Sequence, residues 1–343
     1  MIELTKGNLL EADAEALVNT VNCVGVMGKG IALQFKLAIP DNFTFYEKAC
    51  KAGQMRVGHV LVFETGSLLN PKYIINFPTK RHWKGNSKME DIDAGLVDLI
   101  EQIQRLDIRS IAIPPLGAGL GGLNWSDVKM RIEAAFERLP NTQVLLYEPQ
   151  GAPPVEMMPV NTKKSKMTPG RALLIRLLEI YGWQGYRHSL LEVQKLAYFL
   201  QEAGEPMRLK FKAHHFGPYA DNLNHALQHI EGHFIRGYGD RSAKAEIRLM
   251  PDATEQAREF LKNNAEAEQH LERVKKLIEG FETPYGMELL STVHWVVKHG
   301  NETVGDLESI RAKVESWNQR KKDMMKPQHI QKAYARLQAN GWI

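Results

Sequence analysis

The strongest constraint on the fold is a regular alternation of short apolar runs and helix-like segments in the first 150 residues. The runs are rich in Val, Ile, Leu and aromatic residues and are bounded by turn residues, which is typical of buried strands. They span residues 15–21, 59–64, 72–77, 110–114 and 143–148. Segments 28–40, 89–106 and 125–139 lie between them and carry helical patterns. This alternation predicts an α/β fold with helices on both faces of a sheet.

The remainder of the chain differs in composition and periodicity. A stretch rich in proline, lysine and other polar residues indicates a linker, and helical patterns dominate after it. Thr168 and Pro169 predict a helix start, as do Ser189 and Glu192, which form a capping-box pattern. We therefore expect three parts: a first domain at 1–152, a linker at 153–167 and a mainly α-helical domain at 168–343.

Composition indicates an ordinary globular protein, with 43% apolar and 24% charged residues. No apolar run approaches eighteen residues, and the N-terminus lacks the pattern of a signal peptide. We therefore expect a cytoplasmic protein with no membrane partner. Cys23 and Cys50 are too few for a disulfide framework, so we expect free thiols.

The basic excess lies in the second half of the chain. Up to Pro154 there are 16 Lys and Arg against 17 Asp and Glu, and the remainder has 28 against 23. Such an excess suits a nucleic acid or an acidic protein partner, but a slightly basic helical surface also accounts for it.

Two glycine-containing loops each connect a strand to a helix. The first contains Gly25, Gly28 and Gly30, and the second spans residues 116–122 with four glycines. Glycines let backbone N–H groups approach an anion, and a helix N-terminus adds its positive dipole. Two such loops suggest a grip on a diphosphate, although tight turns needed only for packing would show the same residues. Neither loop matches a P-loop or a dinucleotide fingerprint.

At these residues the chain resembles the macrodomain family, which binds ADP-ribose. The stretch 19–32, the "TKR" of 79–81 and the second glycine loop carry the resemblance. It implies a three-layer α/β/α sandwich with a central mixed sheet, in the branch of ADP-ribosyl glycohydrolases that place a lysine in the site. The whole chain resembles the DarG antitoxin family, whose partner is the DNA-ADP-ribosylating toxin DarT.

The resemblance implies an ADP-ribose site built from both glycine loops. Asn19 and Asn22 would face the distal ribose, Asn8 the adenine amine, and Tyr147 would stack on adenine or simply pack. The implied binding residues are Asn8, Leu9, Asn19, Asn22, Gly25, Met27, Gly28, Lys29, Gly30, Ile31, Ala32, Leu116, Gly117, Ala118, Gly119, Leu120, Gly121, Gly122 and Tyr147.

Lys80 matches the lysine that acts at the anomeric carbon in this branch, and we predict Lys80 and Asn22 as the catalytic residues. A neutral Lys80 amine would attack C1 of the distal ribose; alternatively, a charged Lys80 would stabilise the departing base. A neutral amine requires a lowered pKa, through desolvation or a nearby cation such as Arg81. Some relatives carry an aspartate where this chain has Gly121, so a Lys–Asp pair is in doubt here.

Around Lys80 we predict contacts to DNA. A flat aromatic residue beside cations suits a stacked base and a held phosphate. The alternative is a solvated loop with Trp83 packed onto the domain. Cys23 has no base paired with it in any motif and is not expected to be a nucleophile. The predicted DNA contacts are Thr79, Arg81, His82, Trp83 and Lys84.

In the second half, "QKLAYF" at 194–199 and "GPY" at 217–219 resemble the helical antitoxin module called Panacea or SocA-like. The resemblance implies a surface that captures the toxin; direct DNA binding through the basic excess is the alternative. His225, His229 and His233 have spacing suited to metal ligands, but Gly232 interrupts the helix. We expect no metal and no cofactor.

Together these features predict an antitoxin that removes ADP-ribose from thymidine in single-stranded DNA, releases ADP-ribose and binds the toxin. Two alternatives remain: an ADP-ribose reader without catalysis, and a glycohydrolase that acts on ADP-ribosylated protein glutamate.

Overall fold

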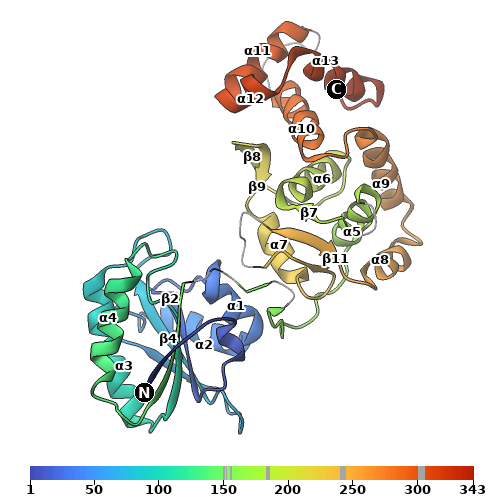
Figure 1. Cartoon of the computed structure of the whole chain (residues 1–343). Coiled ribbons are helices and arrows are strands. Elements are labelled where there is room, and N and C mark those ends of the chain that lie inside the picture. The colour runs from blue at the N-terminus through green and yellow to red at the C-terminus, as the bar shows by residue number, and fades with distance from the viewer. Residues whose placement is uncertain (150, 152, 155–156, 183–185, 240–244, 300–305) are drawn as a thin grey trace. The chain divides into compact units, whose positions relative to one another are not determined.

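A computed structural model describes residues 1–343 except 150, 152, 155–156, 183–185, 240–244 and 300–305 (Figure 1). The chain forms two compact units, and the boundary between Lys163 and Lys164 falls inside the predicted linker. The predicted end of the first domain, residue 152, and linker residues 155–156 lie outside the described residues. Met158 is 3% exposed, and Asn161 donates from its backbone N–H to the Leu37 carbonyl at 2.8 Å. This part of the predicted linker is therefore packed onto the first unit.

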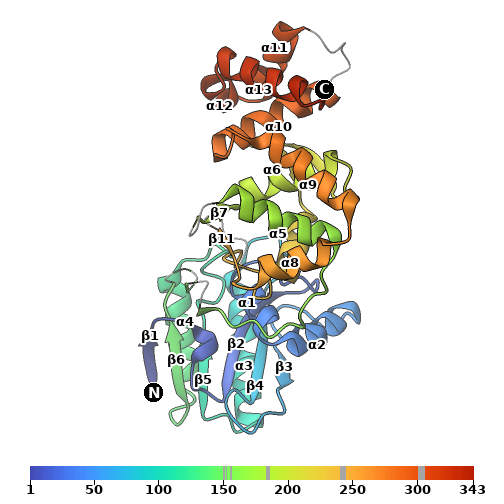
Figure 2. The ribbon, with the colours of Figure 1, turned by 90° about the vertical axis from the view of Figure 1, so that its right-hand side faces the viewer.

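The first unit contains a six-stranded mixed sheet in the order β1-β6-β5-β2-β4-β3, seen in Figure 2. Only β3 runs antiparallel to its neighbour. Its strands are β1 (Ile2–Thr5), β2 (Ala16–Asn22), β3 (Leu61–Glu64), β4 (Tyr73–Lys80), β5 (Ser110–Ile113) and β6 (Gln143–Tyr147). Its helices are η1 (Leu9–Glu11), α1 (Gly30–Ala38), α2 (Pro40–Lys51), α3 (Met89–Arg105) and α4 (Trp125–Phe136).

Helices cover both faces of the sheet, which confirms the predicted α/β/α architecture (Figure 1). Successive residues of a strand point to opposite faces, so Ile75 and Phe77 of β4 pack under α3 while Ile74 faces the other layer. The α3 helix approaches closely because Gly95 has no side chain; a Cβ there would lie 2.4 Å from the Phe77 ring. The sheet is thus fixed from both sides, and its carboxyl edge carries the loops.

The second unit is mainly helical, as predicted. Its helices are α5 (Pro169–Tyr181), α6 (Leu190–Glu202), α7 (Leu223–Ile230), α8 (Ala253–Leu261), α9 (Ala265–Ile278), α10 (Pro284–His299), α11 (Leu307–Trp317), α12 (Gln319–Met324) and α13 (Pro327–Ala339). It also contains short strands that the sequence did not indicate: β7 (His188–Ser189), β8 (Phe211–His214), β9 (Gly217–Ala220), β10 (Ile235–Arg236) and β11 (Glu246–Leu249). They form a β10-β11-β7 sheet and a β8-β9 hairpin.

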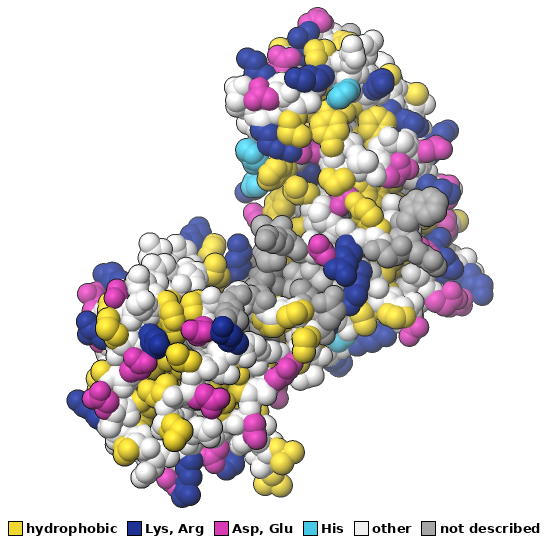
Figure 3. Space-filling view, in the orientation of Figure 1, with side chains coloured by type: hydrophobic (Ala, Val, Ile, Leu, Met, Phe, Trp, Pro, Cys, Tyr) yellow, Lys and Arg dark blue, Asp and Glu magenta, His cyan; other side chains and the backbone are white. Residues whose placement is uncertain are grey.

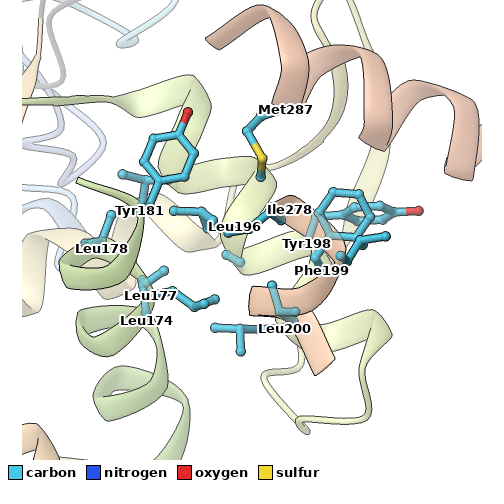
Figure 4. Packing of buried hydrophobic residues seen from close by; sticks show 14 of the residues in the cluster. Leu174, Leu177, Leu178, Tyr181, Leu196, Tyr198, Phe199, Leu200, Ile278 and Met287 are labelled. Carbon is cyan, nitrogen blue, oxygen red and sulfur yellow. The ribbon is translucent and has the colours of Figure 1, made fainter. Parts of the chain in front are cut away.

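The core of the second unit is built where α5 and α6 face each other. Figure 4 shows leucines and Tyr181 of α5 converging on Leu196, Phe199 and Leu200 of α6, with Ile278 and Met287 closing the cluster. The helix starts are those predicted: Thr168 accepts from the Arg171 N–H, and Ser189 with Glu192 forms a capping box.

The two motifs of this unit contact each other inside it. The Gln194 amide both donates to and accepts from the Ala220 backbone, at 3.1 and 2.9 Å, and the buried Lys195 Nζ donates to the Pro218 carbonyl at 2.6 Å. "QKLAYF" therefore holds the strand that contains "GPY". Burial and the nearby Lys321 charge lower the pKa of Lys195 to about 7.

Charges of both signs are interspersed over the visible face of each unit (Figure 3). Among the described helices, none is long and apolar enough to cross a membrane.

Candidate active site

The site begins where β2 and β4 end side by side. The parallel pairing runs from Ala16 opposite Tyr73 to Val21 opposite Pro78, and then shifts so that Asn22 lies opposite Lys80. Pro78 has no N–H to give to the ladder, and such a shift is the usual accommodation. Our sequence-based strand ended at residue 77 and placed Lys80 in a loop; this was wrong, because β4 continues to Lys80. Lys80 is therefore held by a sheet.

The Lys80 side chain reaches across to the second glycine loop. Its Nζ donates to the Leu120 carbonyl at 2.5 Å, and the side chain is partly buried. Burial lowers the pKa of Lys80 below its ordinary value, since desolvation disfavours the ammonium form. Arg81 is not the cause, because its guanidinium pairs with Asp91 at 2.9 Å. More of the Lys80 amine is thus neutral at a given pH than in an exposed lysine.

Asn22 organises the first glycine loop. Its Oδ1 accepts from the Val24 N–H at 3.0 Å and from the Val26 N–H at 3.4 Å, while its Nδ2 donates to the Val26 carbonyl at 2.5 Å. The buried Tyr46 hydroxyl donates to the Asn22 carbonyl at 2.7 Å. In this conformation the Asn22 amide is occupied by the loop, so its predicted ribose contact stays a prediction.

After this loop α1 begins at Gly30, and its cap residue Lys29 makes no side-chain capping bond. The first N–H groups of an α-helix have no intrahelical partner, and they carry the positive end of the helix dipole. Gly30 has a φ of +58°, and a Cβ there would lie 3.4 Å from a Leu120 methyl. The two glycine loops therefore approach each other at the carboxyl edge of the sheet.

The second loop turns sharply at Gly117 and Gly122, with φ of +67° and +81°. The backbone N–H groups of Ala118, Gly122 and Leu123 donate hydrogen bonds to carbonyls of the same loop region. Within the described residues, the consecutive N–H groups of residues 119–121 have no acceptor. Consecutive free N–H groups form a concavity that binds anions.

Several predicted binding residues have buried side chains. Asn19 is fully buried, and its Nδ2 donates to Asn76 Oδ1 at 3.0 Å, while Asn76 and Asn42 bond each other. This asparagine network across β2, β4 and α2 was missed, because nothing in the sequence pairs the three positions. The side chains of Leu9, Met27, Leu116 and Tyr147 are also buried, in three different clusters of the core.

The predicted adenine end is occupied by local contacts. Asn8 Oδ1 accepts from the Leu10 N–H at 3.1 Å and its Nδ2 donates to Glu11 and to the Met157 carbonyl. Tyr147, 9% exposed, packs with Leu9 and Phe35 on one face of the sheet. Burial raises the pKa of the Tyr147 phenol. The adenine roles of both residues stay predictions.

Four of the five predicted DNA contacts have exposed side chains. The His82 and Trp83 rings stack with centroids 5.5 Å apart, and Lys84 Nζ lies 5.0 Å from the centre of the Trp83 ring. Trp83 is 50% exposed and thus presents a flat surface to solvent. Thr79 is only 4% exposed, so the structure gives it no surface for DNA.

Other candidate chemistry is not supported. Burial raises the pKa of the Cys23 thiol to about 11, the opposite of an activated nucleophile. Among the described residues no group of His, Cys, Asp or Glu side chains is arranged to hold a metal ion. His225 and His229 lie in α7, which ends at Ile230, before His233.

The absence of a side chain at residue 121 has a steric cause. A Cβ at Gly121 would lie 2.2 Å from the Gly117 carbonyl oxygen and 2.3 Å from Ser87 Oγ, so no other residue fits this loop conformation. Ser87, which sequence reasoning did not single out, thus belongs to the surroundings of the site.

Comparison with known proteins identifies relatives of this chain. Residues 18–132 match the family model described as "Macro domain". The chain is 50% identical over 342 residues to a "DNA ADP-ribosyl glycohydrolase" of Thermus aquaticus, covering 99% of this chain and 94% of that protein. The solved "Macrodomain of Mycobacterium tuberculosis DarG" is 59% identical over 44% of this chain and 99% of its own, with a TM-score of 0.43. A "DNA ADP-ribosyl transferase-DNA ADP-ribosyl glycohydrolase fusion protein" of Thermosipho africanus is 34% identical over 37% of each chain.

The glycines of the second loop yield a testable contrast. Gly121→Ala should lower the stability of the first unit by about 1–3 kcal/mol, because the added methyl group overlaps Gly117 and Ser87. Gly119→Ala is the matched control, since a Cβ there meets nothing within 4 Å. Thermal unfolding followed by calorimetry measures both; equal melting temperatures for the two variants would contradict the loop geometry.

Proposed function

The chain belongs to the family of DNA ADP-ribosyl glycohydrolases, and from that premise we propose that it removes ADP-ribose from thymidine in single-stranded DNA by hydrolysing the N-glycosidic bond. The observation that carries the proposal is Lys80, a partly desolvated lysine fixed at the carboxyl ends of parallel strands, between two glycine loops. Open α/β sheets place their ligand sites at this edge.

The two loops supply complementary grips for a diphosphate. The free N–H groups of residues 119–121 and the uncapped N-terminus of α1 both favour negative charge. A diphosphate held there leaves one ribose on the side of β2 and β4, where Asn22 and Lys80 lie together. That ribose carries the anomeric carbon in our proposal.

Two routes fit a lysine at this position. In the first, the neutral Lys80 amine attacks the anomeric carbon, the bond to the thymine nitrogen breaks, and water then hydrolyses the imine adduct and restores the amine. In the second, the charged ammonium stabilises the negative charge that develops on the departing base while water attacks. The lowered pKa of Lys80 favours the first route, because it increases the neutral fraction.

The segment after Lys80 suits a DNA leaving group. The stacked His82–Trp83 pair with Lys84 beside it offers an aromatic surface and a cation, which together bind single strands through base stacking and phosphate contact. This surface favours DNA over an ADP-ribosylated protein glutamate as the substrate. The DNA substrate also agrees with the expected location in the cytoplasm.

We predict that Lys80→Ala lowers the rate of ADP-ribose release from a thymidine-modified oligonucleotide by at least about a hundredfold, because the group at the anomeric carbon is lost. The rate should rise with pH through a Lys80 pKa below the ordinary lysine value if the amine attacks, and fall through the same pKa if the ammonium acts. Exposed Lys51 provides the control variant, Lys51→Ala.

The same assay tests the alternatives when ADP-ribosylated protein is offered in parallel. Full activity of Lys80→Ala on DNA would contradict the role of Lys80, and binding of ADP-ribose without release from either substrate by the unchanged protein would leave only the reader function. Release from protein and not from DNA would contradict the proposed substrate.

For the second unit we propose capture of a DNA ADP-ribosyltransferase toxin. The relative in which transferase and glycohydrolase are fused supports a functional link between the two activities. The internal contact between Gln194 and the β9 strand supports a rigid module in which both motif segments share one body. The second unit would then prevent the DNA modification by binding the toxin, and the first unit would remove the modification once it has formed.

This second function separates from catalysis in one experiment. Full-length Lys80→Ala, added in equal amount to the toxin, should still block transfer of ADP-ribose to an oligonucleotide, because capture does not need the glycohydrolase site. Unhindered transfer in its presence, with tight binding of unmodified DNA instead, would favour the DNA-binding alternative.

A further inference from the structure

Ser87 connects the segment after Lys80 to the second glycine loop. It lies two residues before α3, at the end of the connection from β4, and is 7% exposed. Its backbone N–H donates to the Gly121 carbonyl at 3.0 Å. The connection that leaves Lys80 therefore returns to the loop on which the Lys80 amine rests.

The Ser87 hydroxyl is buried without a partner. Among the described residues, no hydrogen bond is found for its Oγ. Buried hydroxyl groups are nearly always paired, and leaving one unpaired costs stability. An unpaired buried hydroxyl calls for an explanation, and a partner that becomes available when the site binds its ligand is one.

The Gly117 carbonyl lies near the Ser87 hydroxyl and could accept a hydrogen bond from it. The same point in space, the missing Cβ of Gly121, lies 2.3 Å from Ser87 Oγ and 2.2 Å from the Gly117 carbonyl oxygen. The two oxygens therefore lie no farther apart than the sum of these two distances, and residue 121 places no side chain beside them. A loop movement that brings them within about 3 Å of each other would let the hydroxyl donate to this carbonyl.

Binding of a diphosphate to the loop would drive that movement. Its consecutive N–H groups at residues 119–121 are free in this structure. An anion that binds all three N–H groups would rotate the peptide units between them. One of these units contains the Leu120 carbonyl, which accepts the hydrogen bond from the Lys80 amine. The position of that carbonyl sets the position of the amine.

We propose that Ser87 is a positioning residue of the glycohydrolase site: when the second glycine loop grips ADP-ribose, its hydroxyl donates to the Gly117 carbonyl and fixes the Leu120 carbonyl against Lys80. The inference rests on the proposed function for its kinetic consequence. The proposal also explains why residue 121 is glycine. Any side chain there would collide with the Ser87 hydroxyl and the Gly117 carbonyl.

Ser87→Ala in the full-length chain tests the proposal. Without ligand, the variant should melt at the same or a higher temperature than the unchanged protein, because it loses an unpaired buried hydroxyl. Its affinity for ADP-ribose, measured by calorimetry, should fall about five- to twentyfold. On the modified oligonucleotide, kcat should fall at least about tenfold, more than KM changes, and the pH midpoint assigned to Lys80 should move upward as the amine becomes more solvated.

Ser110→Ala is the matched control. The Ser110 hydroxyl accepts from the Glu15 N–H at 2.9 Å at the opposite edge of the sheet. This variant should lose thermal stability and keep the affinity for ADP-ribose, kcat and the pH profile.

Two results would overturn the inference: normal affinity and kcat in Ser87→Ala, or a lower melting temperature of the free variant, which would show that the hydroxyl already has a partner. If the unchanged protein fails to release ADP-ribose, the proposed function is wrong, and the calorimetric comparison of the two serine variants still decides the role of Ser87.

Discussion

The site depends on the parallel pairing of β2 with β4 and on the register shift at the end of that pairing. Up to Val21 and Pro78 the strands run in regular register, and after the shift Asn22 lies opposite Lys80. One strand thus provides the residue that shapes the first glycine loop, and its neighbour provides the lysine. Because both strands are buried between helical layers, the two side chains are held by the core of the unit.

The remaining parts of the site are the segments that pack against these two strand ends. The second glycine loop comes close enough for its Leu120 carbonyl to accept from Lys80, and Gly117 and Gly121 allow the close packing of backbone and Ser87. Desolvation of the lysine is a consequence of this approach, and it lowers the pKa in the direction that amine chemistry needs. The fold thereby sets the position of Lys80 and lowers its pKa below the ordinary lysine value.

Local patterns predicted much of this architecture, because strand and helix periods and capping residues act over a few positions. The Ser189–Glu192 capping box and the helix start at Trp125 are examples. Other elements gave no such signal. The β1 strand, Ile2–Thr5, is half exposed at the sheet edge, and α2 buries few side chains, among them a polar Asn42. The predicted strand ended at residue 77, whereas β4 continues three residues further, to Lys80.

The candidate site residues divide in the same way into those that local patterns predict and those that they do not. Lys80 and the glycines were predicted because their motif resembles a family, whereas the roles of Ser87 and of the Asn19–Asn76–Asn42 network depend on contacts between segments distant in the chain. Asn22, predicted to face the ribose, has its amide engaged within the loop in the free protein. Such contacts follow from tertiary packing and have no spacing in the sequence.

A crystal structure of the Lys80→Ala chain bound to an oligonucleotide with an ADP-ribosylated thymidine tests the central claim most directly. The account predicts a diphosphate between the first and second glycine loops and an anomeric carbon that faces residue 80, in the space vacated by the lysine beside the Leu120 carbonyl. An anomeric carbon directed away from residue 80, or an adenine in that space, would contradict it.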